Sequence, residues 1–304
     1  MMLLKKLGHI CMINMLNQNI ASSSVSFFHF FLNSYKKLVL KINLFKFLVL
    51  FIFLSICLVQ KTYIRSSLPS RGGLIFNPDN GRPFSNLAID YFDNGRIKTK
   101  GRYSGGYASG YWVYYYPNGQ LKARGRYYMA SDSKLNGIIE NGRAGKWIFW
   151  HSNGSKKMMG SYKNSQQVGA WTFWHQNGFK HSEGRYRQGK LHGKWKFWYA
   201  NGNIQESGHY ILGLIDGEWQ FWDTLGQLIE SGTYQNGRPI GEHNGWYSSG
   251  GRKWKLNYQF GKIHGPYTSW HENGEPEKSG DYKSGEKYGD WNYWDNNGKK
   301  IINN

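Results

Sequence analysis

The sequence has little cysteine and, after about residue 60, few of the aliphatic residues that build ordinary cores. It contains only two cysteines, Cys11 and Cys57, so residues 77–304 have neither a disulfide nor a thiolate metal site. Because Leu, Ile and Val are sparse there, 14 Trp and 22 Tyr must supply most of the buried apolar area. Together with 39 Gly, this bias is typical of a repeated sequence.

Acidic residues are absent from residues 1–78, which contain nine Lys or Arg. The remainder carries 30 basic and 19 acidic residues, and the net charge of the chain is +20. A basic surface attracts nucleic acid, phospholipid head groups or acidic polymers. No dense run of Lys or Arg appears after residue 78, which favours an ordinary solvated surface of mixed charge.

The N-terminal segment contains thirteen consecutive uncharged residues, 47–59. Because a spanning helix needs about 20 mainly apolar residues, we predict a transmembrane signal-anchor helix over residues 40–60. A cleaved signal peptide and a lipoprotein signal ending at Cys57 are the alternatives. More Lys precedes this stretch than follows it, so residues 1–39 are expected to be cytoplasmic and the rest exported. Residues 61–76, rich in Gly and Ser, are predicted to be an exposed linker.

Residues 77–304 repeat every 24 residues in about nine units. When a Gly is counted as position 1, the typical unit has Tyr at position 3, Gly at 10, aromatics at 12 and 15, and Asn-Gly at 18–19. The first unit departs from this pattern with Ala88 at position 12, as expected of a terminal cap. One unit is eleven residues longer, which predicts a protruding loop over residues 128–138. The repeat-defining residues, predicted to be structural, include Trp171, Trp174, Gly178, Trp195, Trp198, Gly202, Trp219, Trp222, Gly226, Trp291, Trp294 and Gly298.

The spacing predicts an all-β fold in which each unit is one β-hairpin. Asn-Gly between aromatic segments indicates a type I′ turn, with positive φ at both residues. Because side chains alternate along a strand, Trp195 and Phe197 should share one face and Trp198 should lie on the other. Hairpins stacked edge to edge give an elongated, twisted antiparallel sheet that advances about 10 Å per unit.

One stretch resembles the MORN repeat: Tyr186-x-x-Gly189-Lys190-Leu191-His192-Gly193-x-Trp195. The 24-residue spacing with Trp-x-x-Trp and Asn-Gly is similar to the bacterial variant of this repeat, found in YwqK-like antitoxin-type proteins. The resemblance covers residues 77–304 and implies an extended hairpin array used for protein or membrane contacts. It implies no reaction. The N-terminal apolar segment departs from a soluble cytoplasmic antitoxin.

No constellation of catalytic or metal-binding residues is evident. His151, His175 and His271 recur at position 16, and neighbouring units would hold them about 10 Å apart, too far to share a metal ion. We therefore expect no enzyme activity, no cofactor and no metal. We expect a membrane-anchored scaffold that binds a protein partner, in an antitoxin-like manner. The alternative is an envelope module for glycan or anionic lipid; export disfavours nucleic acid.

The units stop being equivalent at two places, the loop 128–138 and the unit around His243. These are the sequence's candidates for a partner contact, because a binding site should break the repeat.

Overall fold

A computed structural model of the chain describes residues 37, 41, 46, 62–131 and 137–301. The chain divides into two compact units, residues 1–61 and 62–304. Apart from Lys41 and Lys46, the predicted span over 40–60 lies outside the described residues, as does nearly all of the predicted segment 1–39. Within the part that is described, no helix is long and apolar enough to cross a membrane.

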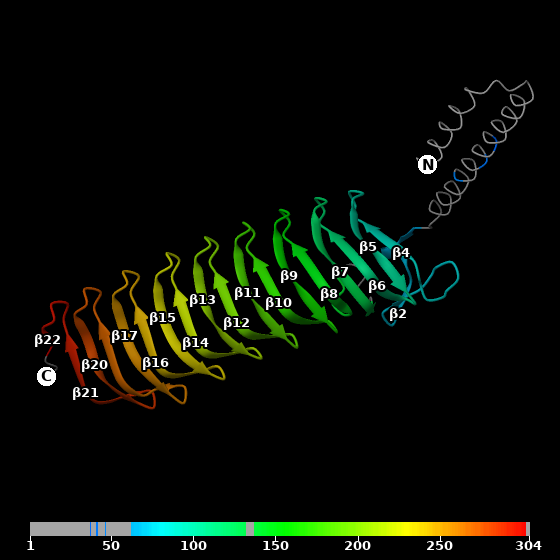
Figure 1. The fold of residues 1–304 in the computed structure, drawn as a ribbon. Coiled ribbons are helices and arrows are strands. Elements are labelled where there is room, and N and C mark those ends of the chain that lie inside the picture. Colours follow the sequence, from blue (N-terminus) through cyan, green and yellow to red (C-terminus); the bar gives the residue numbers. More distant parts are fainter. Residues whose placement is uncertain (1–36, 38–40, 42–45, 47–61, 132–136, 302–304) are drawn as a thin grey trace, which may run out of the picture. The chain divides into compact units, whose positions relative to one another are not determined.

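The second unit contains a 20-stranded sheet and a separate two-stranded sheet, β2–β3. From β4 onward each strand of the large sheet pairs with the strand that follows it in the chain, except that β17 pairs with both β18 and β19. Figure 1 shows this order as a single run of hairpins. These pairings are antiparallel, and β1 adds to β4 in parallel. The elements are β1 (Tyr63–Ile64), η1 (Arg65–Ser67), β2 (Ser70–Arg71), β3 (Leu74–Ile75), β4 (Leu87–Tyr91), β5 (Ile97–Ser104), β6 (Tyr107–Tyr115), β7 (Leu121–Ala130), β8 (Arg143–Trp150), β9 (Lys156–Lys163), β10 (Gln166–Trp174), β11 (Lys180–Arg187), β12 (Lys190–Trp198), β13 (Ile204–Ile211), β14 (Leu214–Trp222), β15 (Leu228–Gln235), β16 (Arg238–Trp246), β17 (Arg252–Gln259), β18 (Lys262–Ile263), β19 (Gly265–Trp270), β20 (Pro276–Lys283), β21 (Glu286–Trp294) and β22 (Lys300–Ile301).

Two kinds of turn alternate along the sheet, and the predicted turn type at Asn-Gly is wrong. At Asn201-Gly202 only the glycine has positive φ, +93°, and its N–H donates to the carbonyl of Tyr199 at 3.0 Å. This is a turn closed by one left-handed glycine. The type I′ geometry occurs in the turns at the other ends of the strands, where Gln188 and Gly189 have φ of 53° and 74°.

The asparagine has a different use from the one predicted. The side-chain oxygen of Asn201 accepts from the N–H of Asn203 at 3.0 Å, which fixes its own turn. Its amide nitrogen donates to the carbonyl of Thr224 in the next turn at 2.7 Å. Asn177 makes the same bond to Ala200 at 2.7 Å. Consecutive turns are therefore tied together by a row of side-chain hydrogen bonds.

Six units are stabilised by a tryptophan that packs on a glycine. The Trp195 ring covers Gly184 so closely that a Cβ there would lie 2.3 Å from the indole. Trp195 donates to the carbonyl of Arg185 at 3.0 Å, and Tyr186 meets its ring edge-on at 5.3 Å. Phe197 stacks beside it at 5.6 Å. The prediction that positions 12 and 14 share a face is confirmed. Positions 1, 3, 12, 14 and 23 make up what we call the aromatic face.

The opposite surface, made by positions 2, 11, 13, 15 and 24, is called the polar face. Glu183 pairs there with Lys196 across β11 and β12. Lys180 lies 2.8 Å from the Glu183 carboxylate and 5.5 Å from the centre of the Trp198 ring. The two tryptophans of a unit thus differ: Trp195 is fully buried and Trp198 only partly so.

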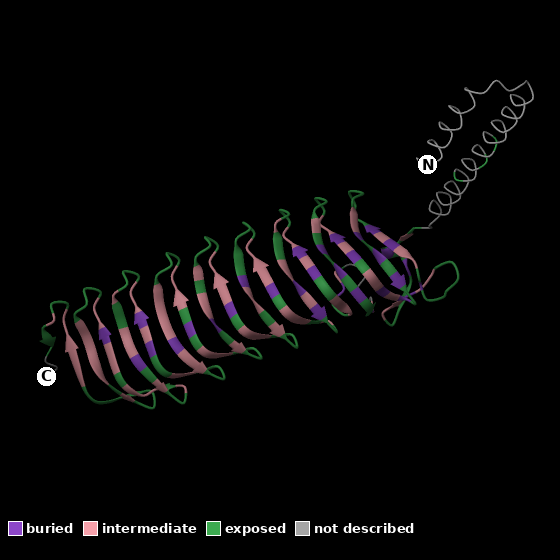
Figure 2. Cartoon of the chain, viewed as in Figure 1, coloured by how far each residue is buried: buried purple, intermediate pink, exposed green. Residues whose placement is uncertain are grey.

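The first strands are covered by the chain that precedes them. Residues 61–76 were predicted to be an exposed linker, but Arg65, Leu68 and Ile75 are buried. They pack with Phe84 into the core cluster of the aromatic face. The prediction failed because the buried residues are single side chains scattered among Ser and Gly, without periodicity. Figure 2 shows buried residues concentrated towards this end of the sheet.

The loop insertion folds back at its C-terminal end. Residues 132–136 are not described, but Ile139 is buried, and its carbonyl accepts a hydrogen bond from the Tyr127 hydroxyl at 2.6 Å. Burial raises the pKa of Tyr127 far above its ordinary value, so this hydroxyl stays protonated. At least this part of the insertion lies on the aromatic face and does not protrude.

Candidate binding surfaces

The charge of the sheet changes sign along its length. Residues 62–200 contain 22 Lys and Arg against 6 Asp and Glu, whereas residues 201–304 contain 10 against 13. The repeat itself does not require this difference in charge, because the units of both halves have the same repeat positions. A charge separation of this size sets which ligands each half attracts.

A groove of about 440 Å³ crosses the polar face of the basic half. Its floor holds Val113 and Ile148, and Arg124, Arg126 and Lys146 surround it. These three cations have no ion pair with any residue the structure describes. Tyr111 is 72% exposed at the groove, with the Arg126 guanidinium 5.4 Å from its ring centre. In the acidic half, the equivalents of the apolar floor are Gln, Asn and Thr.

A row of partly exposed rings also runs along the polar face at position 15. Lys156 and Lys180 lie 5.8 and 5.5 Å from the centres of the Trp174 and Trp198 rings. The row consists of Trp150, Trp174, Trp198, Trp222, Trp246, Trp270 and Trp294. Such a row is a stacking surface for flat apolar groups.

The position-16 histidines are occupied in holding the units together. The ring nitrogens Nε2 of His151 and His175 lie 3.0 and 2.9 Å from the carbonyls of Trp174 and Trp198 in the next unit. Tyr199 takes the same place and donates to Trp222 at 2.8 Å. Among the described residues no group of three or more His, Cys, Asp or Glu is placed to hold a metal ion.

The aromatic face contains arginines in its basic half. Buried Arg65 donates to the Tyr103 hydroxyl at 3.1 Å, and its guanidinium lies 5.5 Å from the Trp112 ring centre. Arg143 lies 5.3 and 5.4 Å from the ring centres of Trp147 and Tyr162. Farther along, the face carries two carboxylates, at Glu206 and Glu230. Burial raises the pKa of both.

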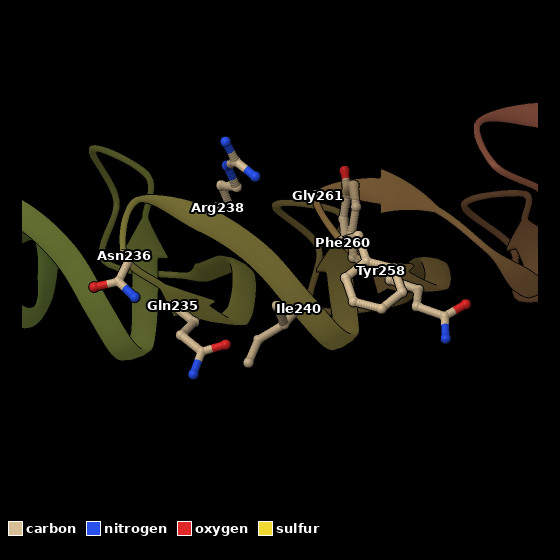
Figure 3. Close-up of a pocket in the computed structure, with 8 residues that line it drawn as sticks. Gln235, Asn236, Arg238, Ile240, Tyr258, Phe260 and Gly261 are labelled. Carbon is tan, nitrogen blue, oxygen red and sulfur yellow. The ribbon is translucent and has the colours of Figure 1, made fainter.

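A groove lies at each of the two places where the units stop being equivalent. A groove of about 700 Å³ beside the insertion is lined by residues 137–141, Phe149 and Met158. A second, of about 490 Å³, lies between the turns after β15 and β17. Figure 3 shows its lining, with Arg238 and Ile240 from β16 near Tyr258 and Phe260. Phe260 is 86% exposed and has φ of 52°, an uncommon position for an aromatic residue.

In that same unit His243 replaces the position-12 tryptophan. It is buried over Gly232, with Nε2 3.0 Å from the carbonyl of Thr233, so it makes the tryptophan's hydrogen bond. Gly245 replaces the position-14 aromatic, and Trp254 from the next strand fills the space. The unit departs from the repeat without losing its packing.

The predicted repeat-defining residues fall into three structural groups. Position-12 residues Trp171, Trp195 and Trp219 are buried over a glycine, whereas Trp291, near the C-terminal edge, is only partly buried. Position-15 residues form the row on the polar face. The glycines at position 19 close turns. The sequence reasoning missed the role of the position-1 glycine. In five units this glycine lies eleven residues before the tryptophan that covers it, and in the unit with the insertion it lies 22 residues before.

The geometry defines a class: a single-sheet hairpin repeat protein in which each unit contacts its neighbours. Five segments match the family described as the MORN repeat variant, namely residues 109–128, 143–164, 191–211, 215–236 and 263–284. The five matched segments lie between β6 and β20.

Other comparisons add little. No curated protein matches the sequence. Among solved structures, similarity was found to the crystal structure of TcdB2-TccC3-Cdc42, at 10% identity and a TM-score of 0.17, over 70% of this chain and 13% of that chain. A Photorhabdus luminescens Tc holotoxin pore gives 11% identity and a TM-score of 0.18, over 75% and 14%. This chain spans about one seventh of those chains or less, and such TM-scores carry no conclusion.

Proposed function

We propose that this chain is a non-enzymatic scaffold, anchored in a membrane by residues 40–60 with its repeats outside the cytoplasm, that binds an acidic segment of a protein partner. MORN repeats generally mediate contacts with proteins or membranes. The observation that carries the choice of partner is the groove around Tyr111, where Arg124, Arg126 and Lys146 lie beside Val113 and Ile148 and form no ion pair with the residues that the structure describes. An acidic segment with an apolar side chain among its carboxylates is complementary to both features.

The test uses the full-length chain in neutral detergent and a fluorescent peptide of alternating Glu and Leu. The triple variant Arg124→Gln/Arg126→Gln/Lys146→Gln should weaken binding by at least about tenfold, and binding should fall steeply with salt. The matched control is Lys253→Gln/Lys262→Gln/Lys299→Gln, which removes equal charge from the other half. Equal losses in the two triple variants would show attraction to net charge alone and refute the proposed groove.

A toxin held through an acidic segment would make the scaffold an antitoxin-like protein. Co-purification of a toxin with the parent chain, and its loss from the groove variant, would support this finer form. Protease digestion of a C-terminal tag from outside intact membranes tests the proposed orientation. Protection of the tag until the membrane is lysed would reverse it.

The second candidate is an envelope module for glycan or anionic lipid, favoured by the tryptophan row with its lysines. Retention on polysaccharide that is insensitive to salt would support the glycan form. Binding to vesicles that requires phosphatidylserine and falls with salt would support the lipid form. Replacing Trp174 and Trp198 by Leu should abolish either interaction and leave the Glu–Leu peptide bound.

A further inference from the structure

The aromatic face changes character between β13 and β15. In the register of these strands, Glu206 is opposite Phe221, and Phe221 is opposite Glu230. Residues paired in this way share a face, with Cβ atoms about 4.5–5.5 Å apart. One aromatic ring therefore lies between two carboxylates, on a surface that is otherwise built from Trp, Tyr and Phe.

No cationic side chain among the described residues forms an ion pair with these carboxylates. Neither Glu206 nor Glu230 has a hydrogen bond or ion pair with any described residue, although both are only partly exposed. Burial raises the pKa of Glu230, and the electrostatic effect of His243, which is hydrogen-bonded through Nε2 to Thr233, offsets only part of that rise. A partly buried, unpaired carboxylate is costly to keep charged, and a cation brought against it relieves that cost.

Elsewhere on the aromatic face, cationic side chains of the chain itself lie over aromatic rings. At position 8, the Arg143 guanidinium lies over Trp147 and donates to the Tyr162 hydroxyl at 3.3 Å. Lys287, also at position 8, lies 4.4 Å from the centre of the Trp291 ring. In the intervening units position 8 holds Gln167, Leu191, Ile215, Pro239 and Ile263. Position 8 thus provides no cation in the units that carry the two carboxylates.

We propose that Phe221, which lies between Glu206 and Glu230, binds an arginine side chain from an extended basic segment of a partner protein. A guanidinium stacks flat on an aromatic ring and meets a carboxylate through two parallel N–H donors, which a lysine cannot do. The acidic excess of residues 201–304 complements such a segment. This site lies on the opposite face from the Tyr111 groove and goes beyond the proposed function.

The experiment measures binding of the full-length chain in neutral detergent to a fluorescent peptide, acetyl-Gly-Ser-Arg-Arg-Arg-Ser-Gly-amide. Glu206→Gln/Glu230→Gln should weaken this binding at least about tenfold, and Phe221→Leu about threefold or more. The matched control, Glu218→Gln/Glu272→Gln, removes two exposed carboxylates away from the site and should change affinity less than about twofold. The Lys analogue of the peptide should bind more weakly than the Arg peptide.

Equal weakening in the site and control variants, or no binding of the Arg peptide at about 1 mM, would overturn the proposal. Unfolding midpoints of all variants, read from tryptophan fluorescence, separate lost binding from lost folding. The Glu–Leu peptide of the preceding section serves as an independent probe. Its binding should be unaffected by Glu206→Gln/Glu230→Gln, so failure of this site and failure of the Tyr111 groove give different results.

Discussion

The two halves of the sheet are built on one repeat, but the aromatic face is covered in one half and open in the other. At the N-terminal end Tyr103 and Tyr127 are each 3% exposed, because residues 62–85 and 137–143 lie over them. Tyr210 and Tyr234 hold the same position in the other half and remain partly exposed. The repeat provides the lateral contacts that form the sheet, and burial of the outer rim of each ring requires an additional segment.

The two halves also differ in the charged groups that lie on the aromatic face. In the covered half, arginines supplied by the chain lie among the rings, and in the open half carboxylates take their place. The comparison teaches that the repeat leaves part of the aromatic face accessible unless a further segment of chain covers it. In the N-terminal half, residues 62–85 and 137–143 of the chain already cover this face. Four changes would break or sharpen this comparison.

The largest effect is expected from removing a buried ring. Trp147→Ala should lower the free energy of unfolding by about 3–5 kcal/mol, because the fully buried indole leaves a cavity between neighbouring strands. Trp291→Ala should cost clearly less, because that ring is partly exposed and its Nε1 has no partner among the described atoms. Urea denaturation of both variants measures the difference. Equal costs would mean that the covering segment adds nothing.

The next effect concerns the glycine under the ring. At one place the pair is naturally changed to Leu256 and Tyr267, which occupy positions 1 and 12. Tyr267→Trp alone should destabilise by about 1–3 kcal/mol, because the larger ring meets a leucine side chain. Adding Leu256→Gly should restore most of that loss. A double variant no more stable than the single one would refute the interlock.

A smaller loss is expected from the arginine of the covered half. Arg143→Ala should lower the free energy of unfolding by about 1–3 kcal/mol, since it leaves the Ile139 carbonyl and the Tyr162 hydroxyl without this donor. Lys287→Ala, which alters an exposed cation over Trp291, should be within about 0.5 kcal/mol of the parent. A comparable loss of unfolding free energy in both variants would indicate that Arg143 does not stabilise the sheet through its contacts with the covering segment.

The smallest effect is a dependence on pH. Burial raises the pKa of Glu206 and Glu230 in the folded state. Between the unfolded and folded pKa values the folded state binds more protons, so stability falls as pH rises through that window. Glu206→Gln/Glu230→Gln should therefore be more stable than the parent at pH 7 and lose this advantage below about pH 4. An unchanged difference across the range, with Glu218→Gln as control, would contradict it.

Periodicity predicted most of the fold. The 24-residue spacing yielded the hairpins, their antiparallel order and the face shared by Trp195 and Phe197. It did not reveal that residues 62–85 cover the aromatic face, because Arg65 and Ile75 have no equivalents in the repeat. The turn type was misassigned because Asn201 is needed for a hydrogen bond to the neighbouring turn, a requirement invisible within one unit.

The candidate sites were less predictable than the fold. The sequence indicated where units differ, and grooves lie at both places, including the one that Phe260 lines. It did not indicate the groove at Tyr111 or the carboxylates beside Phe221. These depend on residues from two or three neighbouring strands, and only the register brings them together.

The direction of the strands has a mechanical consequence. The strands run across the long axis of the sheet, so a force applied to its two ends acts along the inter-strand hydrogen bonds. Such a force separates the strand pairs one at a time. Each unit advances the folded sheet by about 10 Å and yields about 80 Å of extended chain when released. A partner that pulls on one end while the other is held would meet a tether that lengthens in steps of one repeat.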